Sequence, residues 1–352
     1  MDDSSIDDHT VPMRAAVLEA RGKLTLEDRE RPPCPFGGAM IEVSACSVCS
    51  TDVKMLRNGH RDLTYPRVLG HEMVGTVVES RSPHHVKGER VQVFPGIVCG
   101  SCPPCRKGAE NQCPGVRIAG FNHDGGFATN FALPRGGRTN RIPDGVGDDV
   151  AALAEPIACC VNAQQLTSVG DGDAVLILGA GPMGCLHSLV ARHRGAGTVT
   201  LIDPLEDRRA MARRANADLV ASPQDGLDGM VAEMTDGLGA DVIILASRDV
   251  PIDDTLLSLL APRGRISVFS CLPGPLSRPG LDMNTLHYAE NAIVGAYGCT
   301  NAQNREALSM LEEGLDVGWL ITGRFPLSRI HEAFAHAEDR NGLKALVDDM
   351  EG

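Results

Sequence analysis

One short stretch near the middle of the chain constrains its fold more than any other. An apolar run, 174–178, leads into the spacing Gly179-x-Gly181-x-x-Gly184. This pattern predicts a buried strand that turns sharply into a helix over 185–194. The first glycine permits the tight turn, the second lets a pyrophosphate approach the backbone, and the third lets the helix pack closely on the strand. Free N–H groups at the helix start attract a phosphate, so the stretch predicts a dinucleotide site.

A second apolar run, 199–202, follows at the distance expected of a strand–helix–strand unit and ends in Asp203. An acid there accepts hydrogen bonds from an adenosine ribose and repels a 2′-phosphate, so NAD is favoured over NADP. The residues that we expect to bind the cofactor are Gly179, Gly181, Pro182, Met183, Gly184, Asp203 and Arg208.

Length, charge and cysteine usage limit the class of protein. The 352 residues suffice for about two domains. A net charge of −13 argues against nucleic acid or an anionic membrane as partner, and no apolar run approaches a membrane span. Residues 1–12 are acidic and polar, unlike a secretory signal, and we expect them to be disordered. Twelve cysteines without an export signal indicate reduced thiols or metal ligands, and hence a cytoplasmic protein.

Two patterns of predicted secondary structure divide the chain, and together they predict an α/β fold with a β-rich first portion. Up to about residue 148, short alternating runs predict strands separated by long loops. Beyond it, strands alternate with helices, which is typical of a doubly wound parallel sheet. The strands expected in this second portion lie near 174–178, 199–202, 241–245, 265–269 and 292–296. From residue 300 on we expect one or two amphipathic helices and a final apolar segment, 344–347.

Four cysteines, Cys99, Cys102, Cys105 and Cys113, lie close together in one loop. Four sulfurs without histidine suit a closed tetrahedral zinc site, which would hold together a loop too polar to fold by burial. An iron–sulfur cluster, two disulfides and four free thiols are the alternatives. The iron–sulfur interpretation is weakened by the last spacing, which is seven residues where bacterial clusters have three.

A second set of metal-ligand types is scattered along the chain, as a site built from several loops requires. Cys49, His71, Glu72 and Glu155 supply a thiolate, an imidazole and carboxylates, a combination known from catalytic zinc sites with one open position. Each of them alone would be an ordinary core or surface residue. We interpret six other cysteines as core residues: Cys46, Cys159, Cys160, Cys185, Cys271 and Cys299.

Six motifs in order resemble a known family over residues 13–349. They are C-x-T-D at 49–52, G-H-E at 70–72, the four-cysteine loop at 99–113, G-G-F-A at 125–128, A-E-P at 154–156 and the glycine turn at 179–184. The chain resembles the zinc-dependent medium-chain dehydrogenase/reductases of the alcohol dehydrogenase family, and within them the polyol branch that contains sorbitol and threonine dehydrogenases.

The resemblance implies a split architecture. A β-rich, GroES-like catalytic domain would comprise 1–157 and 297–352, with the structural zinc lobe at 95–115. A Rossmann domain with a doubly wound parallel sheet would be inserted as 158–296. The family also implies a homodimer or homotetramer, formed through the edge strand near 293–297.

The resemblance further implies two zinc ions per chain and NAD. Cys49 and His71 would ligate the catalytic zinc, and Glu72 and Glu155 would bind it directly or hold a water on it. The resemblance leaves open which glutamate binds directly. Thr51 would start a proton relay. The implied activity is hydride transfer between NAD and a secondary alcohol or ketone.

Two further residues bear on that relay and its substrate. Asp52 would orient Thr51 and its loop. Lys54 stands where polyol relatives often have histidine, which leaves the last relay step open. Glu155 occupies the position that a cysteine fills in the ethanol-oxidising branch of the family. A glutamate there makes the metal site harder and more anionic, which favours a small hydroxylated substrate: a polyol, sugar, cyclitol or amino alcohol.

Two other functions remain open from the sequence. A reductase acting on an aldehyde, imine or activated alkene would use NADPH, but Asp203 argues against that donor, and the set of Cys49, Thr51 and His71 argues against zinc-free alkene reduction. A redox sensor that binds zinc and nucleotide without turnover is the alternative from another class.

Overall fold

The computed structural model describes residues 12–339 and 342–351 and divides the chain into two compact units. Unit 1 is Met1–Leu153 with Ile321–Gly352, and unit 2 is Ala154–Leu320. Most of the expected disordered extension, residues 1–11, lies outside the described residues, whereas Pro12 already begins a strand.

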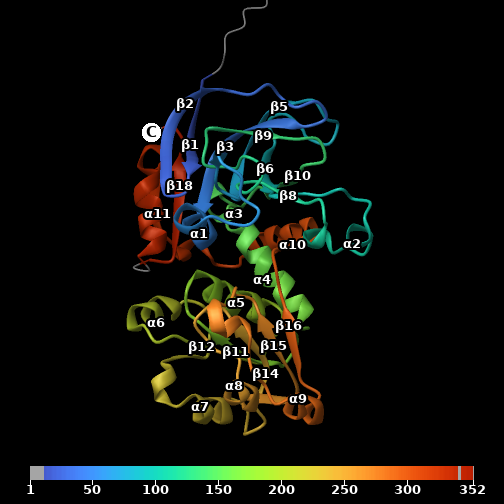
Figure 1. Cartoon of the computed structure of the whole chain (residues 1–352), viewed down its shortest axis with the longest axis vertical. Helices are drawn as coiled ribbons and strands as arrows, with labels where there is room; N and C mark the ends of the chain where they lie inside the picture. Colours follow the sequence, from blue (N-terminus) through green and yellow to red (C-terminus); the bar gives the residue numbers. More distant parts are fainter. Residues whose placement is uncertain (1–11, 340–341, 352) are drawn as a thin grey trace, which may run out of the picture. The chain divides into compact units, whose positions relative to one another are not determined.

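Unit 1 is built mainly of β-strands (Figure 1). One sheet has the order β2-β1-β4, a second has the order β10-β6-β5-β3-β18-β17 with β9 also paired to β3, and β7 pairs with β8 in a small third sheet. Their bounds are β1 (Pro12–Ala20), β2 (Lys23–Glu30), β3 (Ala39–Val48), β4 (Arg67–Val68), β5 (Glu72–Ser80), β6 (Arg90–Phe94), β9 (Asn130–Leu133), β10 (Arg138–Arg141), β17 (Ile321–Pro326) and β18 (Lys344–Asp349).

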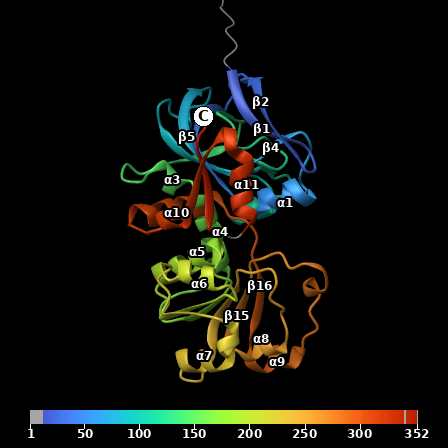
Figure 2. The ribbon, with the colours of Figure 1, turned by 90° about the vertical axis from the view of Figure 1, so that its left-hand side faces the viewer.

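The strand β18 shows how the end of the chain returns to its beginning. It runs antiparallel to β3, with Ala345 opposite Val48 and Val347 opposite Cys46. The helix α11 packs on β18 and β17, and Figure 2 shows it in front of these strands. Apolar side chains from these elements share one core cluster with those of β1 and β5. The other elements of unit 1 are α1 (Ser50–Asn58), β7 (Gly96–Ile97), α2 (Pro103–Arg106), β8 (Arg117–Ile118), α3 (Asp148–Ala151) and α11 (Ile330–Glu338).

Unit 2 contains a six-stranded parallel sheet with the order β13-β12-β11-β14-β15-β16. The order reverses between β11 and β14, which is where doubly wound sheets bind their ligands. The strands are β11 (Ala174–Leu178), β12 (Thr198–Ile202), β13 (Leu219–Ala221), β14 (Ala240–Leu245), β15 (Leu260–Val268) and β16 (Ala292–Gly295). The helices are α4 (Ala154–Leu166), α5 (Pro182–His193), α6 (Glu206–Ala212), α7 (Leu227–Met234), α8 (Asp254–Ser258), α9 (Met283–Ala289) and α10 (Asn301–Glu312).

The predicted strands of the second portion correspond to five of these six. Runs of buried valine, leucine and isoleucine explain why β11, β12 and β14 were readable, since a central parallel strand is covered on both faces. The three-residue strand β13 was missed because it is short and partly exposed. Short 3₁₀ turns occur at Glu110–Gln112, Pro223–Asp225, Gly274–Ser277, Gly318–Leu320 and Leu327–Arg329.

The two units differ in extent from the expected domains at both junctions. Residues 154–157 and 297–320 belong to unit 2, whereas the sequence analysis assigned them to the β-rich domain. The reason is that α10 packs along α4, so both helices stay with the parallel sheet. Among the described residues, helices are too short or too polar to cross a membrane.

Candidate active site and metal sites

The four cysteines of the loop after β7 have the spacing of a tetrahedral metal cage. The Sγ atom of Cys99 lies 4.0 Å from that of Cys105 and 3.6 Å from that of Cys113, and Cys102 completes the group. Zinc–sulfur bonds of about 2.3 Å place tetrahedral sulfurs about 3.8 Å apart. A cluster of several irons needs more room between its sulfurs. The geometry therefore supports a single metal ion.

Backbone hydrogen bonds favour the thiolate form of one cysteine in this group, which is the form that binds metal. Backbone N–H groups of Ser101 and Cys102 donate to the sulfur of Cys99 and lower the pKa of that thiol to about 6. The twelve cysteines, all among the described residues, are free thiols, which argues against the two-disulfide alternative.

The start of α1 presents Cys49, because this residue is the N-cap of the helix. The Cys49 backbone N–H donates to Asp52 Oδ2 at 2.9 Å, and its sulfur accepts a bond from the Thr51 backbone N–H at 3.4 Å. Asp52 is completely buried, and its Oδ1 accepts from the Gly70 backbone N–H at 3.3 Å. One carboxylate thus joins the Cys49 turn to the loop that carries His71, which agrees with the orienting role expected of Asp52.

The G-G-F-A motif supports that same loop. The backbone N–H groups of Gly126 and Phe127 donate to the carbonyls of Gly70 and Leu69 at 2.9 and 3.0 Å. A Cβ atom on Gly125 would lie 2.2 Å from the Gly70 oxygen, so only glycine permits this approach. The motif therefore has a structural role: it fixes the backbone that leads into His71.

Cys49, His71 and Glu72 form the second group, with ligand atoms within 4.8 Å of one another. His71 and Glu72 are buried. Burial lowers the pKa of His71, but the negative charge of the nearby Asp52 carboxylate outweighs it and holds the pKa well above its usual range. His71 Nδ1 lies 3.4 Å from Asp52 Oδ1 without hydrogen-bond geometry. A histidine with a buried ring nitrogen that lacks a hydrogen-bond partner, beside a thiol and a carboxylate, suits a metal ligand.

A buried ion pair that the sequence analysis missed anchors Glu72. Lys344 Nζ lies 2.5 Å from Glu72 Oε2 and donates to the Val48 carbonyl at 3.2 Å, and the Ser47 hydroxyl also donates to Glu72 Oε2. Lys344 is 4% exposed and Glu72 1%. The sequence did contain one sign of this pair, because Lys344 stands at the start of an apolar segment. A lysine is almost never buried unless it is paired with an acid.

In unit 2 the glycine turn has the structure that its spacing predicts. Gly179 directly follows β11 and has φ +115°, and a Cβ atom on Gly184 would lie 1.7 Å from the Gly179 oxygen. A Cβ atom on Gly181 would meet only the Arg208 side chain, at 3.9 Å, so this side of the turn is open. Asp203 is buried after β12, and its carboxylate accepts from the backbone N–H groups of Ala180 and Leu205 at 2.8 and 2.9 Å. The structure thus brings Gly179, Gly181, Gly184, Asp203 and Arg208 together.

Comparison with known proteins identifies the family. Residues 36–144 match the alcohol dehydrogenase GroES-like domain, and residues 182–313 match the zinc-binding dehydrogenase domain. A D-altritol 5-dehydrogenase from Agrobacterium fabrum is 31% identical over 328 residues, which cover 90% of this chain and 94% of that protein. The chain belongs to the zinc-dependent medium-chain alcohol dehydrogenase family.

Two solved structures that contain a bound nicotinamide cofactor are similar to this alcohol dehydrogenase. A putative zinc-binding dehydrogenase from Sinorhizobium meliloti, bound to NADP, has a TM-score of 0.86 and 28% identity, covering 96% of this chain and 99% of its own. A short chain alcohol dehydrogenase from Escherichia coli, complexed with NADH, has a TM-score of 0.85 and 26% identity, with coverages of 96% and 99%.

These findings confirm the main predictions for the dehydrogenase. The family, the α/β fold with a GroES-like and a Rossmann domain, and the oxidoreductase class are as expected. Zinc and a nicotinamide dinucleotide are the cofactors of the family, and the residues described above suit both. The sensor without turnover is therefore set aside.

The dehydrogenase departs from the sequence analysis at two cysteines. Cys46, Cys160, Cys185 and Cys299 are buried as predicted, but Cys271 is exposed in the loop after β15 and Cys159 is only half-buried. The sulfurs of Cys159 and Cys299 also lie close to the Glu155 carboxylate, within 4.8 Å. They meet because α10 packs along α4 and brings residue 299 to the first turns of α4. Glu155 belongs to unit 2 and is buried, and its predicted part in the metal site of Cys49 and His71 stays a prediction.

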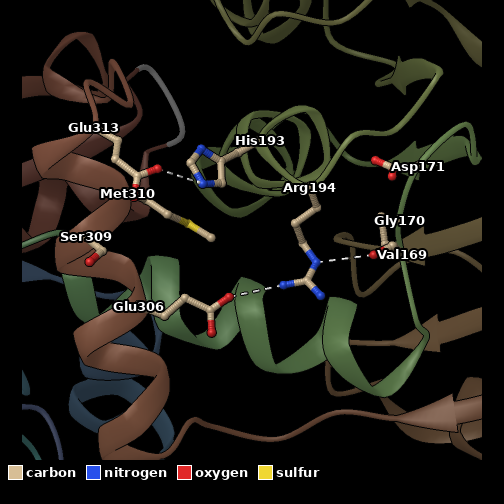
Figure 3. A pocket seen from close by; sticks show the side chains of 9 residues that line it. All are labelled: Val169, Gly170, Asp171, His193, Arg194, Glu306, Ser309, Met310 and Glu313. Atoms are coloured by element: carbon tan, nitrogen blue, oxygen red, sulfur yellow. Dashed lines mark hydrogen bonds and ion pairs between the residues drawn. The ribbon is translucent and has the colours of Figure 1, made fainter.

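A surface pocket of about 400 Å³ in unit 2, whose lining residues are shown in Figure 3, is not lined by any of the predicted site residues. Its charged side chains pair with one another: Arg194 Nη1 lies 3.1 Å from Glu306 Oε1, and His193 Nε2 lies 3.4 Å from Glu313 Oε2. Arg194 also donates to the Val169 carbonyl at 3.3 Å. These pairs tie α5 to α10, and we assign the pocket no ligand.

Proposed function

We propose that this dehydrogenase catalyses the reversible oxidation of a secondary alcohol in a polyol, sugar, cyclitol or amino alcohol, with NAD as hydride acceptor. The observation that carries the proposal is the group of half-buried Cys49 with buried His71 and Glu72, which offers a thiolate, an imidazole and a carboxylate within 4.8 Å. Three such protein ligands leave a fourth position open, as catalytic zinc sites require.

Cys49 and His71 would hold the metal through Sγ and a ring nitrogen. Zinc, when bound, supplies Lewis acidity, which lowers the pKa of an alcohol as it does that of water. Glu72 would be the third ligand, with its Oε2 held by Lys344 and Ser47. The prediction that Glu155 also serves this metal comes from the family resemblance alone.

Thr51 is the proposed entry of the proton relay. It lies in the first turn of α1, two residues from Cys49, and is partly exposed. Its hydroxyl would accept the alcohol proton at Oγ1 and pass it towards solvent. Asp52 would keep Thr51 in place through the helix cap that it forms with Cys49. Lys54, on the same helix, is exposed, and we give it no part in the relay.

The glycine turn would hold the pyrophosphate at the start of α5, where backbone N–H groups are free. Pro182 and Met183 form the first turn of this helix. The nicotinamide, when bound, supplies the hydride acceptor, and the protein supplies alignment. Asp203, whose carboxylate accepts from the Ala180 backbone N–H of the glycine turn, favours NAD because a 2′-phosphate would meet its negative charge.

The substrate class follows from the donor set and from one relative. A carboxylate and an imidazole beside a single thiolate make a harder site than a thiolate pair does, which favours a hydroxyl-rich substrate. The relative from Agrobacterium fabrum is named for an alditol, D-altritol. We therefore place polyols first among the candidates.

The test is turnover with NAD⁺ across a panel of alditols, sugars, cyclitols and amino alcohols. We expect at least one alditol to reduce NAD⁺, and Cys49→Ala to lower kcat/KM by about 10³-fold or more, because metal Lewis acidity contributes several kcal/mol. Cys34→Ala is the matched control, since Cys34 is a buried thiol of unit 1 outside the ligand groups.

Two outcomes would contradict the proposal. Full turnover and full zinc content in Cys49→Ala would remove this residue from the site. Failure with every alcohol, together with NADPH-dependent reduction of an aldehyde, imine or activated alkene, would favour the reductase instead.

We further infer a homo-oligomer formed through β16. This strand is the edge of the parallel sheet, its residues are only partly covered, and Tyr288 and Tyr297 on either side are 82% and 47% exposed. An exposed strand edge is a template for pairing with a second chain. The cytoplasmic location stays a prediction from the cysteine content.

A further inference from the structure

One face of the parallel sheet presents a buried serine to the helices α4 and α5. Ser267 lies in β15 between Arg265 and Phe269, and alternate residues of a strand share one face of its sheet. Arg265 Nε donates to the carbonyl of Thr167, the residue after α4, at 2.9 Å. The Phe269 ring meets the His187 ring of α5 edge-on, with 4.5 Å between their centroids. Ser267 therefore lies on the face of the sheet that these two helices cover.

The two helices contribute a glutamine and a histidine to the same region. Gln164 on α4 and His187 on α5 are both fully buried. Gln164 Nε2 donates to the His187 backbone carbonyl at 2.8 Å and lies 3.3 Å from His187 Nδ1. Because a carbonyl only accepts, the amide NH₂ faces His187, and Nδ1 accepts its second hydrogen.

This contact fixes which ring nitrogen of His187 carries the proton. A neutral imidazole has one N–H, so with Nδ1 as acceptor the proton lies on Nε2. Burial lowers the pKa of His187 to about 3, which keeps the ring neutral at physiological pH. His187 Nε2 is therefore a hydrogen-bond donor inside the core of unit 2.

Three buried polar atoms of this region have no hydrogen-bond partner among the described residues: Gln164 Oε1, His187 Nε2 and Ser267 Oγ. Buried polar atoms are costly when they are unpaired, and most of them bond to protein or to ordered water. The three are chemically complementary, because the ring N–H donates, the amide oxygen accepts and the hydroxyl does either.

We propose that an internal water molecule binds between α4, α5 and β15, with hydrogen bonds to His187 Nε2, Gln164 Oε1 and Ser267 Oγ. The water accepts from the ring N–H and donates to the amide oxygen, and about three such bonds are usual for a buried water. A metal ion suits these atoms poorly, since the ring nitrogen that faces it is protonated and the other two groups are neutral. The water joins α5, which begins in the glycine turn, to α4 and to the sheet.

The deciding experiment is a crystal structure of the full-length wild-type protein at a resolution that shows ordered water. We expect electron density for a water within about 3.2 Å of His187 Nε2 and of Ser267 Oγ. Continuous packing without such density, or a direct hydrogen bond between His187 and Ser267, would overturn the proposal. This result does not depend on the folding of any variant.

Nuclear magnetic resonance of protein labelled with ¹⁵N-histidine tests the same site in solution. We expect a protonated Nε2 on His187 and a cross-relaxation signal between this proton and water. Ser267→Val should abolish the signal, because its methyl groups replace one partner of the water and fill its place. Ser188→Ala is the matched control, since this buried serine already donates to the Ala215 carbonyl at 2.6 Å, and it should keep the signal. A proton on Nδ1, or a water signal that survives in Ser267→Val, would contradict the site.

Discussion

At the residue scale, the ion pair of Lys344 and Glu72 is the contact on which the proposed active site most depends. Burying a carboxylate is costly unless a charged partner and hydrogen bonds compensate it. Lys344 supplies the charge, and Ser47 and the Val48 carbonyl complete the hydrogen bonding. The same oxygen, Glu72 Oε2, accepts from both donors, which restricts how the carboxylate can turn.

Removing the lysine should be strongly destabilising. Lys344→Met keeps the side-chain volume but leaves the buried Glu72 carboxylate without its charged partner, and for the metal-free protein we expect the free energy of unfolding in urea to fall by about 3–5 kcal/mol. The double variant Lys344→Met/Glu72→Gln should recover most of that loss. Arg57→Met, which breaks the solvent-exposed pair with Glu338, serves as control and should change the stability much less than Lys344→Met does. A loss in Lys344→Met no larger than in this control would refute the anchoring role.

At the element scale, the turn from β11 into α5 has two kinds of glycine. Gly184 lies where the helix presses against the turn, and any Cβ atom would collide with the Gly179 carbonyl at 1.7 Å. Gly181 faces open space and has an ordinary φ of −74°. Gly184 is therefore required by the packing of the protein itself, and Gly181 by the cofactor that we expect to bind there.

Two alanine variants should separate these requirements. Gly184→Ala should lower the free energy of unfolding by about 3 kcal/mol, as overpacking against backbone does, and should also weaken NADH binding. Gly181→Ala should fold normally but raise the Kd for NADH about 10-fold or more, because its methyl group occupies the place of the pyrophosphate. Urea unfolding and NADH fluorescence titration measure the two effects. Equal stability of the two variants would show that this division is wrong.

At the scale of the whole molecule, the parallel sheet has two edges of different character. The edge strand β16 is flanked by exposed Tyr288 and Tyr297, whereas β13, at the other edge, precedes a polar 3₁₀ turn. Charged side chains on an edge strand discourage pairing with another sheet, so the two edges can be compared directly.

We expect light scattering after size exclusion to give a dimer or tetramer for wild type. Val294→Lys, on β16, should shift the protein to a smaller species, since a buried lysine would oppose strand pairing. Val220→Lys, on β13, is the matched control and should leave the mass unchanged. A monomeric wild type at all accessible concentrations would contradict the inference, as would dissociation caused by the β13 variant alone.

The sequence was sufficient wherever local spacing carries the chemistry. The glycine turn, the acid after β12 and the cysteine loop each act through residues close in the chain, so spacing alone indicates their geometry. The central strands were readable because both of their faces are buried. The family motifs also pointed to Cys49, His71 and Glu72, which the structure brings together.

Tertiary structure decided what depends on partners distant in the chain. Lys344 lies 272 residues from Glu72, and the pairing of β18 with β3 brings the two together. Cys299 lies 144 residues from Glu155 and reaches it only through the packing of α10 on α4. The boundaries of the two units follow from the same packing. Sequence by itself determined the family, the two kinds of cofactor and the local turns, because these are encoded by neighbouring residues. The tertiary fold decided which charges and thiols meet, because strand and helix pairing are long-range.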